Sequence, residues 1–315
     1  MNNFKILSDF GCDLPEHLLT QYGIEVIPTN LHIEGEGSVR SDSLDVTDFY
    51  AKLREKKMIK TSAINMQMFK NRFEEHLAQG IDVLYVGMSA GLSATFTAAK
   101  LAAEELAEEY PERKVRLLDS RSGSGGVGLI AYLAAQKREE GADLEEVHTY
   151  MTDICSRMHS WFTVDDLFFL KRGGRLSTAT AIVGSLFMIK PILTVDDEGK
   201  LFAWGKGRGK KGAIDIIVRR AEELAFDPEN STFVISHADC MEDAVALEML
   251  LRTKWDIQNI ITTDIGPAFG AHCGPGGLAL FFIGKEAEDV DNADECSEEC
   301  PEEITANNEN PETSA

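Results

Sequence analysis

Cysteine is scarce in this sequence, and its pattern excludes the common metal and disulfide frameworks. The 315 residues include six cysteines with no CxxC pair, which is typical of a protein from a reducing compartment. Cys296 and Cys300 are four residues apart, but no histidine or second cysteine pair lies near them. We therefore expect a cytoplasmic protein without a metal site.

Long hydrophobic runs and positive charge are also in short supply. No apolar run reaches the ~20 residues of a membrane-spanning helix, and Met1 to Phe4 leads directly into a strand pattern instead of a signal peptide. Lys and Arg number 31 against 53 Asp and Glu, so the net charge is −22. We therefore expect no stable membrane insertion and no nucleic-acid partner.

The shortage of cations is most pronounced at the C-terminus. Residues 286–315 hold twelve Asp or Glu and no Lys or Arg, with only a few isolated apolar residues. Such a segment is expected to form a disordered acidic tail. The remaining length and the apolar content of 43% fit two globular domains, which we place at 1–159 and 160–285.

Strand and helix patterns alternate through the first domain. Short apolar runs such as Val83–Val86 predict buried parallel strands, and Leu31–Ile33 is interpreted as an extension of a strand at 24–27. The second domain contains a predicted hairpin that turns through Asp196–Gly199. We therefore expect an α/β fold with a mainly parallel sheet flanked by helices, followed by a domain with a mixed or antiparallel sheet.

The segment from Asp82 to Tyr110 is the most informative. A buried strand runs into a small hydroxyl-rich turn, and a helical pattern begins at Thr95. A helix N-terminus favours an anion, and Ser89, Ser93 and Thr95 add hydroxyl donors there. This pattern predicts a carboxylate or phosphate site. The alternative is that Ser93 only caps the helix.

A second hydroxyl pair precedes another predicted helix. Thr61 and Ser62 follow Lys60 and come shortly before a helical pattern at 66–79. Helix capping explains one of these hydroxyls, and a ligand explains the other.

A nucleophile elbow is the competing hypothesis. Gly87 to Gly91 reads GMSAG, and Asp264 and His272 follow Ser89 in the chain order of an α/β-hydrolase triad. Against this, the helical pattern begins several residues past Ser89, and the second half of the chain is a separate domain. Cys273 beside His272 is no better a nucleophile, because sequence neighbours usually point apart.

Eight motifs in order resemble the DegV family of bacterial fatty-acid-binding proteins, over about residues 4–285. They are SDFGCDLP (8–15), KTS (60–62), SAGLSATF (89–96), LDS (118–120), LKRGGRLS (170–177), KPIL (190–193), SHAD (236–239) and IGPAFGAHCGPGG (265–277).

The resemblance implies two α/β domains with one fatty acid, such as palmitate, buried between them. It implies that Thr61, Ser93 and His272 hold the carboxylate. It also implies that the protein is no enzyme itself but presents its ligand to an ATP-dependent fatty-acid kinase, which makes acyl-phosphate. Ser62, Ser89 and Thr95 would then support the ligand-binding side chains, and no other cofactor is expected.

The sequence departs from the family pattern at two places. Ala94 stands where glycine is usual, and Ala63-Ile64-Asn65 replaces Gln-Pro-Ser. We expect Ala94 to fit a helical position and the second change to alter the pocket wall.

The tail-lining and partner-binding residues are separate predictions. The candidates for lining the acyl chain are Phe96, Ile182, Leu186, Ile265 and Phe269, and the alternative for each is the hydrophobic core. The candidates for docking the kinase, on an otherwise acidic protein, are Arg172, Arg175, Lys206 and Arg208, and the alternative is a solvated turn.

Overall fold

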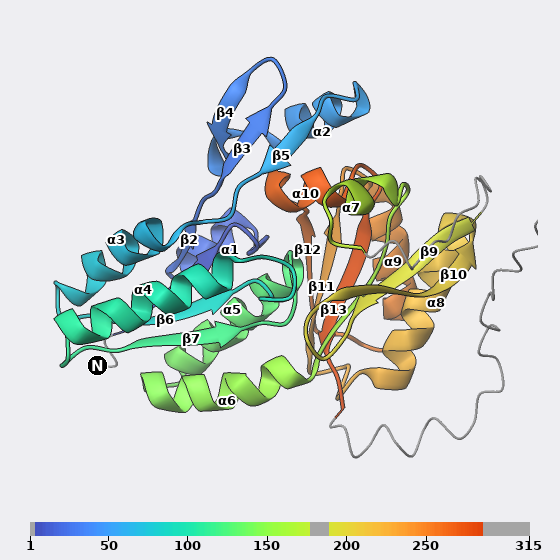
Figure 1. The fold of residues 1–315 in the computed structure, drawn as a ribbon. Helices are drawn as coiled ribbons and strands as arrows, with labels where there is room; N and C mark the ends of the chain where they lie inside the picture. Colours follow the sequence, from blue (N-terminus) through green and yellow to red (C-terminus); the bar gives the residue numbers. More distant parts are fainter. Residues whose placement is uncertain (1–3, 177–188, 286–315) are drawn as a thin grey trace, which may run out of the picture.

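The computed structural model describes residues 4–176 and 189–285 (Figure 1). Ile182 and Leu186, two of the residues proposed to line the acyl chain, lie outside the described residues. The acidic tail at 286–315 does so as well.

The first domain is built on a four-stranded parallel sheet in the order β2-β1-β6-β7. Its strands are Phe4–Asp9 (β1), Ile24–Ile27 (β2), Asp82–Gly87 (β6) and Val115–Asp119 (β7). Ile6 pairs with Ile24 on one side and with Leu84 on the other. Five of the six residues of β6 are buried, as its continuous apolar run predicted.

Helices cover both faces of this sheet (Figure 1). They are Glu16–Gln21 (α1), Met66–Leu77 (α3), Thr95–Glu109 (α4), Gly125–Glu139 (α5) and Leu144–Ser156 (α6). Helices α3 and α4 pack together on one face, and α5 and α6 on the other. The predicted parallel α/β domain is therefore confirmed.

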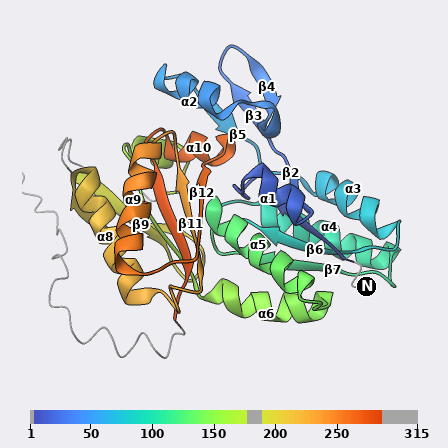
Figure 2. The same cartoon turned by 180° about the vertical axis from the view of Figure 1, so that it is seen from behind.

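Helix α5 also packs against the second sheet, so it lies between the two domains (Figure 2). Glycines at its start allow this approach: a Cβ on Gly125 would lie 2.3 Å from the Ser236 Oγ, and one on Gly126 would lie 2.8 Å from a ring carbon of Phe281. Ten of its fifteen residues are buried. The hydrophobic core therefore runs from one domain into the other around α5.

The second domain carries a six-stranded mixed sheet in the order β10-β9-β8-β13-β11-β12, and only β11 and β12 are parallel. Its strands are Met158–Thr163 (β8), Ile189–Val195 (β9), Leu201–Arg208 (β10), Thr232–His237 (β11), Asn259–Asp264 (β12) and Leu278–Ile283 (β13). The helices are Phe168–Arg172 (α7), Gly209–Leu224 (α8), Met241–Lys254 (α9) and Pro267–Cys273 (α10). The predicted mixed sheet and the β9–β10 hairpin are confirmed.

A third, three-stranded antiparallel sheet in the order β4-β3-β5 was not predicted. Its strands are Asn30–Ile33 (β3), Gly37–Arg40 (β4) and Ile59–Thr61 (β5), and it is accompanied by the short helices Ser41–Ser43 (η1) and Val46–Arg54 (α2). The expectation that Leu31–Ile33 extends β2 was wrong, because Leu31 pairs with Val39 and with Thr61. This small sheet places Thr61 beside α10.

Candidate functional site

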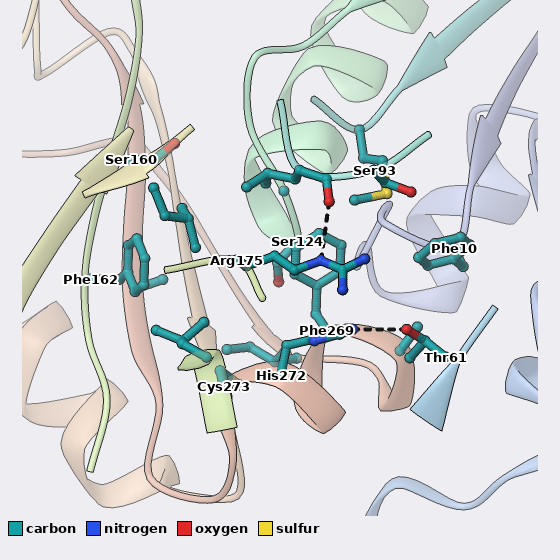
Figure 3. A pocket seen from close by; sticks show the side chains of 18 of the residues that line it. Phe10, Thr61, Ser93, Ser124, Ser160, Phe162, Arg175, Phe269, His272 and Cys273 are labelled. Carbon is teal, nitrogen blue, oxygen red and sulfur yellow. Dashed lines mark hydrogen bonds between the residues drawn. The ribbon is translucent and has the colours of Figure 1, made fainter. Parts of the chain in front are cut away.

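A cavity lies between the domains, where the carboxyl ends of β1 and β6 face the β8–β9 region and α10 (Figure 3). The empty space at this site, including open solvent at its mouth, is about 860 Å³. Ligands of open α/β sheets bind at this edge, beyond the carboxyl ends of the strands. Thr61, Ser93 and His272 all line the cavity, so the structure brings the three predicted residues to one site.

Thr61 and His272 are in direct contact. Thr61 ends β5, His272 lies in α10, and the Thr61 Oγ1 is 2.8 Å from the His272 Nε2 (Figure 3). Burial lowers the pKa of His272 to about 4, with Arg175 and Arg172 adding to the effect. The imidazole is therefore neutral at pH 7 and can donate one N–H. The other ring nitrogen, Nδ1, is buried without a hydrogen-bond partner.

Ser93 lies on the turn between β6 and α4. The helix begins at Thr95 and its N-cap position is Ala94, so the alternative that Ser93 is the N-cap residue was wrong by one position. The Ser93 Oγ still accepts the Thr95 backbone N–H at 3.2 Å and lies 2.9 Å from the Thr95 Oγ1. Ala94 has helical backbone angles, as predicted.

The KTS segment does not cap α3. The side chain of Asn65 accepts the N–H of Met68 at 3.0 Å and caps that helix, while Thr61 belongs to a strand. Neither Thr61 nor Ser62 is needed for capping, and both line the cavity. The hydroxyls therefore remain available to a ligand.

Arg175 is a residue of the site whose place the sequence did not reveal. It was predicted as a kinase-docking residue, yet it lines the cavity, and its Nε donates to the Leu92 carbonyl at 3.2 Å (Figure 3). Burial lowers its pKa from the usual arginine value. Of the described residues that line the cavity, Arg175 is the one with a permanent charge, and that charge is positive. It suits an anionic ligand.

The remaining lining is mostly apolar. Ile265 and Phe269 belong to it, as predicted, and Phe96 does not, because its ring stacks on Tyr85 at 6.1 Å in the core of the first domain. The other large apolar lining residues are Phe10, Met88, Leu92, Phe162, Leu170, Val195, Leu201 and Phe281.

A buried carboxylate fixes the turns around the cavity. Asp9, at the end of β1, accepts the Tyr85 hydroxyl at 2.5 Å, the Met88 N–H at 3.0 Å and the Gly11 N–H at 2.8 Å. Burial raises its pKa, and these hydrogen bonds oppose the rise. Asp9 thereby ties the β1 and β6 turns to each other.

The residues of the hydrolase hypothesis occupy separate networks. The fully buried Ser89 donates its hydroxyl to the Gly199 carbonyl at 2.8 Å. The Asp264 Oδ1 lies 3.5 Å from the Nδ1 of His237, and His272 contacts Thr61. This geometry gives the triad no support.

The other basic residues lie outside the cavity. Lys206 and Arg208 are exposed on β10, an edge strand of the six-stranded sheet. Arg172 is partly buried, and its guanidinium lies 5.1 Å from the Phe169 ring centre.

Within residues 4–176 and 189–285, the helices are all too short or too polar to span a bilayer. The same ranges contain no group of three or more His, Cys, Asp or Glu side chains placed to hold a metal ion.

The chain is similar to known proteins over almost all of its described length. The family described as "Uncharacterised protein, DegV family" matches residues 3–285. A DegV domain-containing protein of Clostridium perfringens is 36% identical over 290 residues, which cover 91% of this chain and 100% of that protein.

Solved structures agree with this match. A DegV family protein of Thermus thermophilus, described by its fatty-acid binding, has a TM-score of 0.81 and 28% identity, covering 90% of this chain and 100% of that one. A DegV lipid-binding protein of Thermotoga maritima has a TM-score of 0.78 and 28% identity, covering 90% and 98%. Sequence, fold and site geometry therefore converge: the chain belongs to the DegV family.

Proposed function

We propose that the protein binds one long-chain fatty acid in the inter-domain cavity and has no catalytic activity of its own. The observation that carries this proposal is a hydroxyl–imidazole pair, Thr61 and His272, on the wall of a largely apolar cavity whose charged lining residue is Arg175. A carboxylate head and a hydrocarbon tail match that combination. The Thermus thermophilus and Thermotoga maritima relatives, described as binding fatty acid and lipid, support the proposal.

The tail supplies most of the binding free energy in this proposal. At about 0.8 kcal/mol per buried CH₂, ~15 methylenes contribute ~12 kcal/mol before the costs of ordering the ligand. The head-group residues then select a carboxylate and fix its direction. Ser93 donates a hydrogen bond to it, Thr61 and His272 donate to it once the ligand replaces their mutual hydrogen bond, and Arg175 compensates its charge.

The neighbouring hydroxyls have supporting roles. Thr95 is buried and contacts Ser93, so it orients that side chain. Ser62 lines the cavity next to Thr61. Ala63, one of the departures from the family pattern, also lines the cavity, and we propose that it affects the preferred acyl chain.

Lipid extraction followed by mass spectrometry tests fatty-acid binding directly. The protein purified from bacterial cells should carry a fatty acid at one per chain, visible also as a mass shift in native mass spectrometry. Ser93→Ala should retain less of it, and Ser43→Ala, an exposed serine on η1, should retain the wild-type amount. A purified protein that neither carries nor takes up fatty acid would contradict the proposal.

The serine hydrolase hypothesis has its own test. A fluorophosphonate probe labels an activated serine, and the buried Ser89 with its hydroxyl donated to Gly199 should not react. Labelling that disappears in Ser89→Ala would favour the hydrolase.

We further propose that the protein presents its bound acyl chain to an ATP-dependent fatty-acid kinase in the cytosol. The exposed cations Lys206 and Arg208, with Arg172 nearer the cavity, offer a positively charged contact on an acidic protein. Charge reversal at Lys206 and Arg208 should slow acyl-phosphate formation by a fatty-acid kinase without changing fatty-acid binding. Arg219→Glu, an exposed cation on α8, is the control. Equal rates in all variants would remove this surface from the proposal.

A further inference from the structure

The tip of the β9–β10 hairpin reaches across from the second domain and rests on the turn after β6. Ser89, on that turn, donates its hydroxyl to the carbonyl of Gly199 at 2.8 Å, and its side chain is fully buried. The two residues are 110 positions apart in the chain. This is therefore a contact between domains and not a feature of either one.

The two turns fit so closely that neither tolerates a side chain at the contact. A Cβ on Gly91 would lie 2.6 Å from the Glu198 carbonyl oxygen. A Cβ on Gly199 would lie 2.0 Å from the Ser89 Oγ, and Gly199 also has a φ of +71°. Glycine on both sides is thus a requirement of this contact.

The contact closes one wall of the ligand cavity. Val195 and Leu201 flank the hairpin turn, pair with each other across the hairpin, and line the cavity. Leu92 and Ser93, which follow Ser89 on the first-domain turn, line it too. The wall is consequently made of two pieces from different domains that meet at Ser89 and Gly199.

We propose that the hairpin turn 196–199 is a clasp on the turn 89–91, and that opening this clasp admits and releases the ligand. Ser89 is then a positioning residue that keeps this wall of the cavity closed. A single neutral hydrogen bond is a modest barrier, so the clasp can open while both domains stay folded. The nature of the ligand, a fatty acid, rests on the proposed function above; the clasp itself rests on the geometry.

Gly91→Ala tests the clasp without altering a residue that lines the cavity. Its Cβ must push the Glu198 carbonyl away, whereas Gly205→Ala places a Cβ on the same hairpin with nothing within 4 Å. Both variants and the wild type would be loaded with cis-parinaric acid, a fluorescent fatty acid, and mixed with excess albumin. Gly91→Ala should release the probe at least ~10-fold faster, and Gly205→Ala at the wild-type rate.

The association rate of the fatty acid distinguishes an opened clasp from the loss of a contact between protein and ligand. Opening a clasp raises the association and dissociation rates together, whereas loss of a ligand contact raises dissociation alone. Ser89→Ala should behave as Gly91→Ala does, and Ser89→Cys, a weak donor of similar size, should lie between Ser89→Ala and the wild type. If Gly91→Ala does not fold, Ser89→Ala and Ser89→Cys still test the clasp.

Hydrogen–deuterium exchange of the hairpin at 189–208 separates this inference from the proposed function. Exchange at the tip should be faster in Gly91→Ala than in Gly205→Ala, whether or not a ligand is bound. A wild type that takes up no fatty acid would refute the proposed function, and the exchange data would still decide whether the contact opens. Wild-type release rates, or unchanged exchange, in both Gly91→Ala and Ser89→Ala would overturn the clasp.

Discussion

The Nε2 of His272 lies 2.8 Å from the Oγ1 of Thr61, although 211 residues separate them in the chain. Thr61 ends the last strand of the small three-stranded sheet, and His272 lies in the helix that follows β12. The pair forms only when α10 packs against β5. The polar end of the proposed site is therefore assembled by tertiary packing.

Thr61→Val should weaken fatty-acid binding by about 10- to 100-fold. Valine keeps the shape of threonine but removes one hydrogen bond to a charged group, which contributes about 1.5–3 kcal/mol. Equilibrium titration with a fluorescent fatty acid measures the change. Thr97→Val, at an exposed position of α4, should bind like the wild type. Equal affinities for the two variants would show that the Thr61 hydroxyl does not contact the ligand.

Arg175→Met should reduce the preference for a fatty acid over its methyl ester by about 10-fold or more. The guanidinium favours a charged carboxylate, and the neutral ester lacks that charge. Arg175 also donates to the Leu92 carbonyl, so its loss can disturb that turn and weaken the binding of both ligands. Dividing the affinity for the acid by the affinity for the ester within each variant removes this shared effect. Arg175→Lys retains the charge and should keep most of the preference. An unchanged ratio in Arg175→Met would place the head group elsewhere.

The buried His272 should make the ligand-free protein less stable as the pH falls from 6.5 to 4. Its pKa is lowered to about 4 in the fold, so the unfolded chain binds the proton first and unfolding is favoured across that window. The full effect is on the order of 3 kcal/mol. In delipidated protein, His272→Asn should flatten the fall of Tm across this window. His17→Asn, an exposed histidine on α1, should not, and parallel curves for the two variants would contradict this account.

Asp9→Ala should destabilise the protein by about 3 kcal/mol or more. The change leaves the Tyr85 hydroxyl and the Met88 and Gly11 N–H groups without their acceptor, at about 1–3 kcal/mol per buried group. Relief of the buried charge offsets only part of this loss. Tm should fall by about 6–12 °C. Asp215→Ala, at an exposed position of α8, is the control, and a similar Tm for both would mean that Asp9 does not hold the turns together.

Regular elements were predictable because their sequence signals are local. The apolar run at 83–86, for example, corresponds to the strand Asp82–Gly87. The small sheet was missed because β3 is only four residues long and one of its two partners, β5, is distant in the chain. Nothing in a four-residue run reveals which distant strand it pairs with.

The motifs and the family resemblance pointed to three residues that line the cavity, Thr61, Ser93 and His272, but not to its cation. Arg175 belongs to a basic glycine turn that resembles a solvated surface loop, and only the packing of that turn against Leu92 directs it into the cavity. The N-cap of α3, in contrast, has a local sequence signal. Asn65 stands directly before the helix and is a typical N-cap residue, but the hydroxyls of Thr61 and Ser62 lie close enough in sequence to compete for that role.

The last described strand, β13, lies in the middle of its sheet, between β8 and β11. A chain still emerging from the ribosome can complete the first domain early, because all four strands of its parallel sheet come before residue 120. The second sheet cannot be completed as early, because β8 and β11 both pair with β13, and β13 is absent until residues 278–283 have been synthesised. A nascent chain therefore leaves the first-domain side of its future cavity uncovered until translation of the second domain is almost finished.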